Sequence, residues 1–183
     1  AIPTISAIIN AGGTPRLVDI GQDYLINVKK IKKEISKKTK AIIPVHLYGQ
    51  MCEMDSIIKL AKKENIMVIE DCAQSQGAKY KNKYSGTIGT FGCFSFYPTK
   101  NLSALGDAGA ILTNCTKTAE KIKSLRNHGR GSENLIGRNS RCDHLQAAVL
   151  HLKLQNAEQL NNQRKNIAKL YYKHLPSLYN AMP

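Results

Sequence analysis

The chain has 183 residues and a formal net charge of +14, with 42 % apolar and 22 % charged residues. This balance is typical of a globular protein with a sizeable core, and it excludes disordered and collagen-like classes. No stretch approaches the ~20 apolar residues of a membrane-spanning helix, and no apolar block near Ala1 suggests a signal peptide, so we expect no membrane association.

Short apolar runs alternate with helical patterns along the chain, as in parallel strands joined by crossover helices. Strands are predicted over residues 16–20, 41–45, 66–69, 92–97 and 109–113. Apolar residues at helical spacing predict helices around residues 28–35 and 54–61, and from Asp143 through Leu152 toward Tyr171. The predicted fold class is therefore α/β, with a mostly parallel sheet and flanking helices.

The positive charge is concentrated in a segment with seven lysines between Tyr24 and Lys40. Val28, Ile31 and Ile35 recur there at helical spacing, which places the lysines on the opposite, solvated face of a helix. A surface that binds nucleic acid is the alternative, but it lacks interleaved aromatic residues and a binding motif, so nucleic acid is not the favoured partner.

Five scattered cysteines, at positions 52, 72, 93, 115 and 142, form no Cys-x-x-Cys pair. The spacing argues against a disulfide framework and a zinc site, so no metal is expected. Free thiols favour a reducing compartment, which predicts a cytoplasmic location.

Polar side chains gather where predicted strands end, which is where α/β sheets bind ligands. His46 and Tyr48 follow the strand at 41–45, Asp71 follows that at 66–69, and Lys100 follows that at 92–97. A carboxylate and an amine therefore emerge from neighbouring strand ends, within reach of one ligand. Taken singly, each residue has a structural alternative: Asp71 could cap a helix, and His46 could be a hydrogen-bonded core residue.

Four ordered blocks carry a resemblance to a known family: PVHLYG, VIEDCAQSQGA, SFYPTKNLSALGDAGAI and GRNSRCDHLQAAVL, spanning roughly residues 46–150. They resemble the DegT/DnrJ/EryC1/StrS family of sugar aminotransferases, which depend on pyridoxal 5'-phosphate (PLP). The resemblance implies a fold-type I large domain over residues 1–150 that lacks its N-terminal part. It also implies that residues 151–183 form a long helix leading toward a small C-terminal domain outside this chain, and that the chain is a piece of a longer polypeptide.

The resemblance also implies roles for individual residues. Lys100 would bond covalently to the cofactor and move protons, and Asp71 would pair with the pyridine nitrogen. Gln74 would lie near the ring hydroxyl and Ser95 would bind the phosphate. Lys100 can act only if its amine becomes neutral, which requires burial or nearby positive charge.

Other implied roles concern the substrate and the assembly. Asn139 would reach the phosphate from a second subunit, which implies a homodimer with composite active sites. Arg141 would add positive charge, unless it forms a surface salt bridge, and His46 and Tyr48 would line the substrate pocket.

The implied reaction moves an amino group from an amino acid, L-glutamate, to a keto group of a nucleotide-diphosphate sugar. Three alternatives stay open at this point: a sugar dehydratase of the same family, a truncated or inactive member that acts as a binding or regulatory module, and a nucleic-acid-binding protein. The dehydratase branch has histidine where this chain has Lys100, so the lysine favours transamination.

Overall fold

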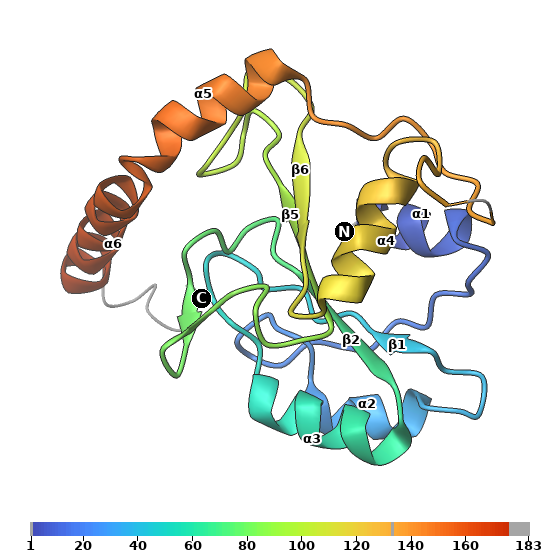
Figure 1. Ribbon diagram of the computed structural model, residues 1–183. Coiled ribbons are helices and arrows are strands. Elements are labelled where there is room, and N and C mark those ends of the chain that lie inside the picture. The colour runs from blue at the N-terminus through green and yellow to red at the C-terminus, as the bar shows by residue number, and fades with distance from the viewer. Residues whose placement is uncertain (1, 133, 176–183) are drawn as a thin grey trace.

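Alternating strands and helices build the α/β fold that the sequence predicts (Figure 1). The computed structural model describes residues 2–132 and 134–175. Its main sheet has the strand order β1-β2-β5-β6, with β1 (Ala41–Ile42), β2 (Met67–Asp71), β5 (Phe91–Ser95) and β6 (Gly109–Leu112). The strands β1, β2 and β5 pair in parallel and β6 pairs with β5 antiparallel, so the mostly parallel sheet is confirmed.

The core lies between β1, β2 and the two helices α2 (Val28–Glu34) and α3 (Met54–Glu64). The Asn27 side chain caps α2 by accepting a hydrogen bond from the Lys29 amide at 3.1 Å. Ile31 faces the core and the neighbouring lysines face solvent, which confirms the solvated-face interpretation. The buried apolar side chains of this core are Leu25, Ile31, Ile42, Cys52, Met54, Ile57, Ala61 and Val68.

Four further helices of the described chain lie outside this core: α1 (Ile2–Asn10), α4 (Thr116–Leu125), α5 (His144–Leu154) and α6 (Ala157–His174). In the described part of the chain, none of them contributes a buried residue. Figure 1 shows α5 and α6 leading away from the sheet. The long helix predicted over 151–183 is divided at residues 155–156, and residues 176–183 of it lie outside the described residues. The division into domains stays a prediction.

The strand predicted over residues 16–20 is wrong. Among the described residues, Ile20 alone of this segment pairs, in an isolated bridge with Ile26, and no described strand forms a ladder with it. The strand predicted over 41–45 ends early at Ile42 and continues as a single bridge between Val45 and Asp71. Pro44 has no amide proton to donate, although its carbonyl still accepts from the Asp71 amide at 2.9 Å.

A hairpin of β3 (Lys79–Tyr80) and β4 (Lys83–Tyr84) was not predicted from the sequence. Its turn residues, Lys81 and Asn82, have φ values of 46° and 66°, and the turn carries no glycine that would have marked it. None of the helices in the described part of the chain combines the length and apolar character needed to cross a bilayer.

Candidate functional site

The carboxyl ends of β2 and β5 lie side by side, because these parallel strands pair in register, with Asp71 opposite Cys93. Asp71 is the last residue of β2 and Ser95 is the last residue of β5. The chain that follows β1 joins the same edge, since the His46 amide donates to the Asp71 carbonyl at 3.0 Å. Three chain segments thus deliver polar residues to one edge of the sheet, as the sequence predicts.

A cavity of about 580 Å³ opens at this edge. Three predicted site residues line it: Ser95, Lys100 and Arg141. Lys100 is half-buried in the loop after β5, where its amide donates to the Tyr97 carbonyl at 2.9 Å. The remaining lining residues are Pro3, Tyr97, Asp107, Ala108, Gly109, Ser140 and Cys142.

The Asp71 carboxylate is held at both oxygens. The Thr4 hydroxyl donates to Oδ2 at 2.7 Å, and the Ala73 amide donates to Oδ1 at 3.1 Å. Thr4 directly follows Pro3, which lines the cavity, so α1 connects the carboxylate to the cavity wall. Thr4 was not predicted as a site residue, because nothing in the sequence around residue 4 signals a partner 67 positions away.

Gln74 holds the turn that contains Tyr48, and neither residue is among those that line the cavity. The Gln74 Oε1 accepts from the Tyr48 amide at 3.2 Å, and its carbonyl accepts from the Gly49 amide at 2.9 Å. Tyr48 has a φ of 57° and is exposed, with its ring edge-on to Tyr24 at a centroid distance of 6.4 Å. The roles predicted for Gln74 and Tyr48 toward cofactor and substrate stay predictions.

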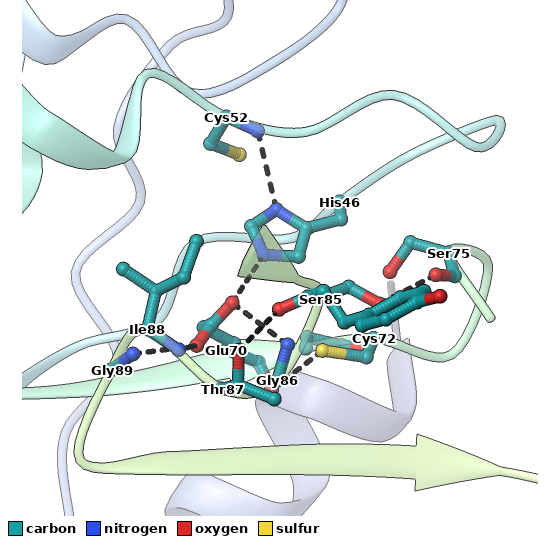
Figure 2. Close-up of polar contacts among 12 residues, drawn as sticks. His46, Cys52, Glu70, Cys72, Ser75, Ser85, Gly86, Thr87, Ile88 and Gly89 are labelled. Atoms are coloured by element: carbon teal, nitrogen blue, oxygen red, sulfur yellow. Dashed lines mark hydrogen bonds and ion pairs between the residues drawn. The ribbon is translucent and has the colours of Figure 1, made fainter. Parts of the chain in front are cut away.

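His46 belongs to a buried polar cluster beneath the strand ends (Figure 2). Its Nδ1 accepts from the Cys52 amide at 3.2 Å, so the ring proton is on Nε2, which donates to Glu70 Oε2 at 3.0 Å. Both ring nitrogens are engaged and the side chain is fully buried, with 0 % exposure. The assignment of His46 to the substrate pocket is therefore corrected: it is the hydrogen-bonded core histidine that the alternative described.

Glu70 is the acceptor at the centre of this cluster. Besides His46, it accepts from the amides of Gly86 at 2.9 Å, Ile88 at 2.8 Å and Gly89 at 2.6 Å (Figure 2). Burial by itself raises the pKa of Glu70, but the His46 N–H and the three amides outweigh it, so the pKa lies below its ordinary value. The carboxylate is thus ionised and saturated with donors.

The ligand atoms of His46, Glu70 and Cys72 all lie within 4.8 Å of one another, which is compatible with metal binding. However, both nitrogens of His46 and both oxygens of Glu70 already have protein donors or acceptors. Burial raises the pKa of the Cys72 thiol to about 12, so its sulfur stays protonated. We therefore interpret this cluster as structural.

Asn139 and Arg141 lie on a loop that pairs with the segment just after α4 through an Asn127–Asn139 bridge. Arg141 donates from Nη1 to the neutral Asn127 Oδ1. In the described part of the chain it forms no ion pair, so its positive charge is available to the cavity it lines. Asn139 is exposed and does not line the cavity, and its role toward a second subunit stays a prediction.

Gln76 is a second residue that the sequence analysis did not identify. Its nearly buried Nε2 donates to the Ser95 carbonyl at 2.8 Å and to the Ala73 carbonyl at 3.2 Å, so it ties together the two segments that carry Ser95 and Asp71. Asn161 of α6 donates to the Gln76 carbonyl at 2.9 Å. A glutamine two residues from Gln74 in the same QSQ segment was the available signal.

Two named relatives cover most or all of this chain. A dTDP-3-amino-3,6-dideoxy-alpha-D-galactopyranose transaminase of Aneurinibacillus thermoaerophilus is 48 % identical and covers 100 % of this chain and 51 % of the relative. A pleiotropic regulatory protein of Geobacillus stearothermophilus is 44 % identical and covers 92 % of this chain and 46 % of the relative. The chain thus spans about half the length of the curated relatives it matches.

Solved structures with the same fold include a DegT DnrJ EryC1 StrS aminotransferase from Brucella abortus, with a TM-score of 0.91 at 37 % identity. That match covers 97 % of this chain and 51 % of the other. A Bacillus subtilis protein with bound cofactor PMP has a TM-score of 0.87 at 34 % identity, over 99 % of this chain and 42 % of the other. The model of one family matches residues 2–183. The chain belongs to the DegT/DnrJ/EryC1/StrS aminotransferase family.

Proposed function

We propose that the protein carrying this chain is a PLP-dependent aminotransferase that moves an amino group from L-glutamate to a keto group of a nucleotide-diphosphate sugar. The observation that carries this proposal is the cavity at which Ser95, Lys100 and Arg141 meet, beside the strand end that bears Asp71. Family membership and the transaminase name of the Aneurinibacillus relative support it.

The residues at this edge fit the three functional groups of PLP. The cofactor has a phosphate, an aldehyde and a pyridine nitrogen, and these call for a cation with hydroxyl donors, an amine and a carboxylate. Arg141 and Ser95 would bind the phosphate, Lys100 would bond to the aldehyde, and Asp71 would pair with the pyridine nitrogen. A volume of about 580 Å³ is ordinary for a small-molecule site. When bound, PLP supplies the electron sink that transamination requires.

Asp71 would hold the positive charge of a protonated ring nitrogen. Two opposite unit charges about 4 Å apart attract by ~4 kcal/mol at an effective dielectric constant near 20. Both Asp71 oxygens already accept one hydrogen bond, from Thr4 and from the Ala73 amide, and each keeps a second acceptor site for a ligand N–H.

Lys100 would carry the cofactor and move the proton at its Nζ. Its loop begins at Ser95, whose Oγ accepts from the Tyr97 amide at 3.3 Å, so the Ser95 O–H is free to donate to a phosphate oxygen. Lys153 of α5 holds the far side of the loop by donating to the Ser103 carbonyl and hydroxyl, at 2.8 and 3.0 Å.

The finer assignments follow from the family and are part of the proposal. Gln74 would approach the ring hydroxyl, and Tyr48 would border the sugar. Asn139 would reach the phosphate of a second subunit in a homodimer. The free cysteines Cys52 and Cys72 are compatible with a cytoplasmic protein.

A regulatory module without transaminase activity is the second candidate, because the Geobacillus relative is named a pleiotropic regulatory protein. A sugar dehydratase is disfavoured by Lys100. These candidates differ in one observable: only the aminotransferase converts L-glutamate to its keto acid in the presence of a nucleotide-linked keto-sugar.

The test uses the natural gene product, titrated with PLP. We expect visible absorption from lysine-bound cofactor, and keto-acid release from L-glutamate when a keto-sugar acceptor is present. Lys100→Ala should abolish both, whereas Lys63→Ala, which changes an exposed lysine in the last turn of α3, should leave both unchanged. A wild-type protein that binds no PLP under saturating conditions contradicts the proposal.

A further inference from the structure

The first turn of α1 approaches the candidate site from a distant part of the sequence. Pro3 lines the cavity together with Lys100, and the next residue, Thr4, donates its hydroxyl proton to Asp71 Oδ2 at 2.7 Å. Thr4 is half-buried, whereas its helix neighbours Ile2 and Pro3 are exposed. Thr4 lies outside the four sequence blocks that carry the family resemblance, and no role was predicted for it.

The Thr4 hydroxyl makes a long-range contact and not a local one within its helix. A helical threonine usually donates to a carbonyl three or four residues earlier. In the described structure the Thr4 Oγ1 donates to a residue far away in the sequence, Asp71, 67 positions along the chain. The hydroxyl points instead to a carboxylate on the neighbouring strand end.

We propose that Thr4 is a positioning residue that fixes the orientation of the Asp71 carboxylate toward the ring nitrogen of PLP. This inference rests on the proposed function. The torsion that turns an aspartate carboxylate is broad and soft, so its orientation is set by its hydrogen-bond partners. Thr4 holds Oδ2 and the Ala73 amide holds Oδ1, which together define the carboxylate plane.

The Thr4 hydroxyl is the contact that a side-chain change can remove, since the other donor is a backbone amide. Thr4→Val keeps the branched shape and deletes the donor. A hydrogen bond to a charged group is stronger than a neutral one. We therefore expect the dissociation constant for PLP to rise about tenfold, which corresponds to ~1.4 kcal/mol.

The experiment uses the natural gene product loaded with PLP labelled with ¹⁵N in the ring, and measures the ring ¹⁵N chemical shift and the PLP dissociation constant. Thr4→Val should move the ¹⁵N signal toward the unprotonated form and weaken PLP binding. Thr4→Ser, which keeps the hydroxyl, should show the wild-type ¹⁵N shift and a PLP dissociation constant within about twofold of the wild-type value. Thr87→Val is the matched control, because Thr87 also donates a hydroxyl hydrogen bond of 2.7 Å, to the Tyr84 carbonyl in a turn that does not line the cavity.

The outcomes separate this inference from the proposed function. If the wild type binds no PLP, the proposed function fails and takes the inference with it. If the wild type binds PLP but Thr4→Val leaves its ¹⁵N shift and affinity unchanged, only the inference is overturned. It is overturned equally if Thr87→Val has the same effect as Thr4→Val, or if Thr4→Ser behaves like Thr4→Val. Thr4→Ala replaces Thr4→Val if the valine variant does not fold.

Discussion

Replacing Glu70 with glutamine should destabilise the protein by about 3–6 kcal/mol, although the two side chains have nearly the same shape. Glu70 is fully buried and accepts four hydrogen bonds. Its Oε1 accepts from the amides of Ile88 and Gly89, and its Oε2 accepts from the Gly86 amide and the His46 ring. Glutamine replaces one of these oxygens with an NH₂ group that can only donate.

Both orientations of the glutamine amide place this NH₂ against two donors. Against the Ile88 and Gly89 amides it loses two hydrogen bonds outright. Against His46 the ring could change tautomer to accept, but its Nδ1–H would then face the Cys52 amide, another donor. Two lost bonds to a buried charge, at about 1.5–3 kcal/mol each, give the magnitude above.

Urea unfolding measures this loss directly, with an unchanged m-value as the sign that the two-state transition is intact. Glu53→Gln is the matched control, because Glu53 is exposed and accepts a hydrogen bond from the Tyr80 hydroxyl that a glutamine carbonyl can also accept. We expect the control to change the unfolding free energy by less than about 0.5 kcal/mol. If Glu70→Gln matches the control, the four hydrogen bonds do not stabilise the folded state as we describe.

The pKa shifts of Glu70 and of the cysteines give two further predictions. Because the pKa of Glu70 is lower in the folded state, its stabilising contribution is present above its ordinary pKa of 4.5 and is lost as the pH falls through the folded value. The urea midpoint of the wild type should therefore fall more steeply below pH 4.5 than that of Glu70→Gln. Equal slopes for the two proteins would refute this prediction. Burial raises the pKa of the Cys52 and Cys72 thiols to about 12, whereas a hydrogen bond from Thr118 lowers that of the exposed Cys115. Iodoacetamide should accordingly label Cys115 first, as read by mass spectrometry, and equally fast labelling of Cys72 would contradict the described burial.

Apolar runs and helical spacing correctly predicted those helices and strands that depend mainly on their own local sequence. The apolar run at 66–69 became β2 with a shift of one or two residues, and the helical spacing of Met54, Ile57 and Ala61 became the buried face of α3. The segment at 16–20 has an equally strand-like composition, but in the described part of the chain it pairs only through the Ile20–Ile26 bridge, and a strand needs a ladder of such pairs. Composition could not reveal that difference.

The site shows the same division between local and long-range information. The rule that ligands bind at strand ends placed Lys100 at this edge, and the family resemblance added Ser95; both line the cavity. The rule does not predict the direction in which a side chain points. The His46 side chain points into the core, where it pairs with Glu70. The rule does not predict Thr4 either, because a hydrogen bond across 67 residues leaves no local signature.

The central claim is that one lysine at the edge of this sheet holds the cofactor. Borohydride reduction of the natural gene product in the presence of PLP makes the lysine–cofactor bond permanent, and peptide mapping by mass spectrometry then locates it. We predict a single phosphopyridoxyl group on Lys100, which lines the cavity with Ser95 and Arg141. A label on another lysine, or no label at saturating PLP, would contradict the account.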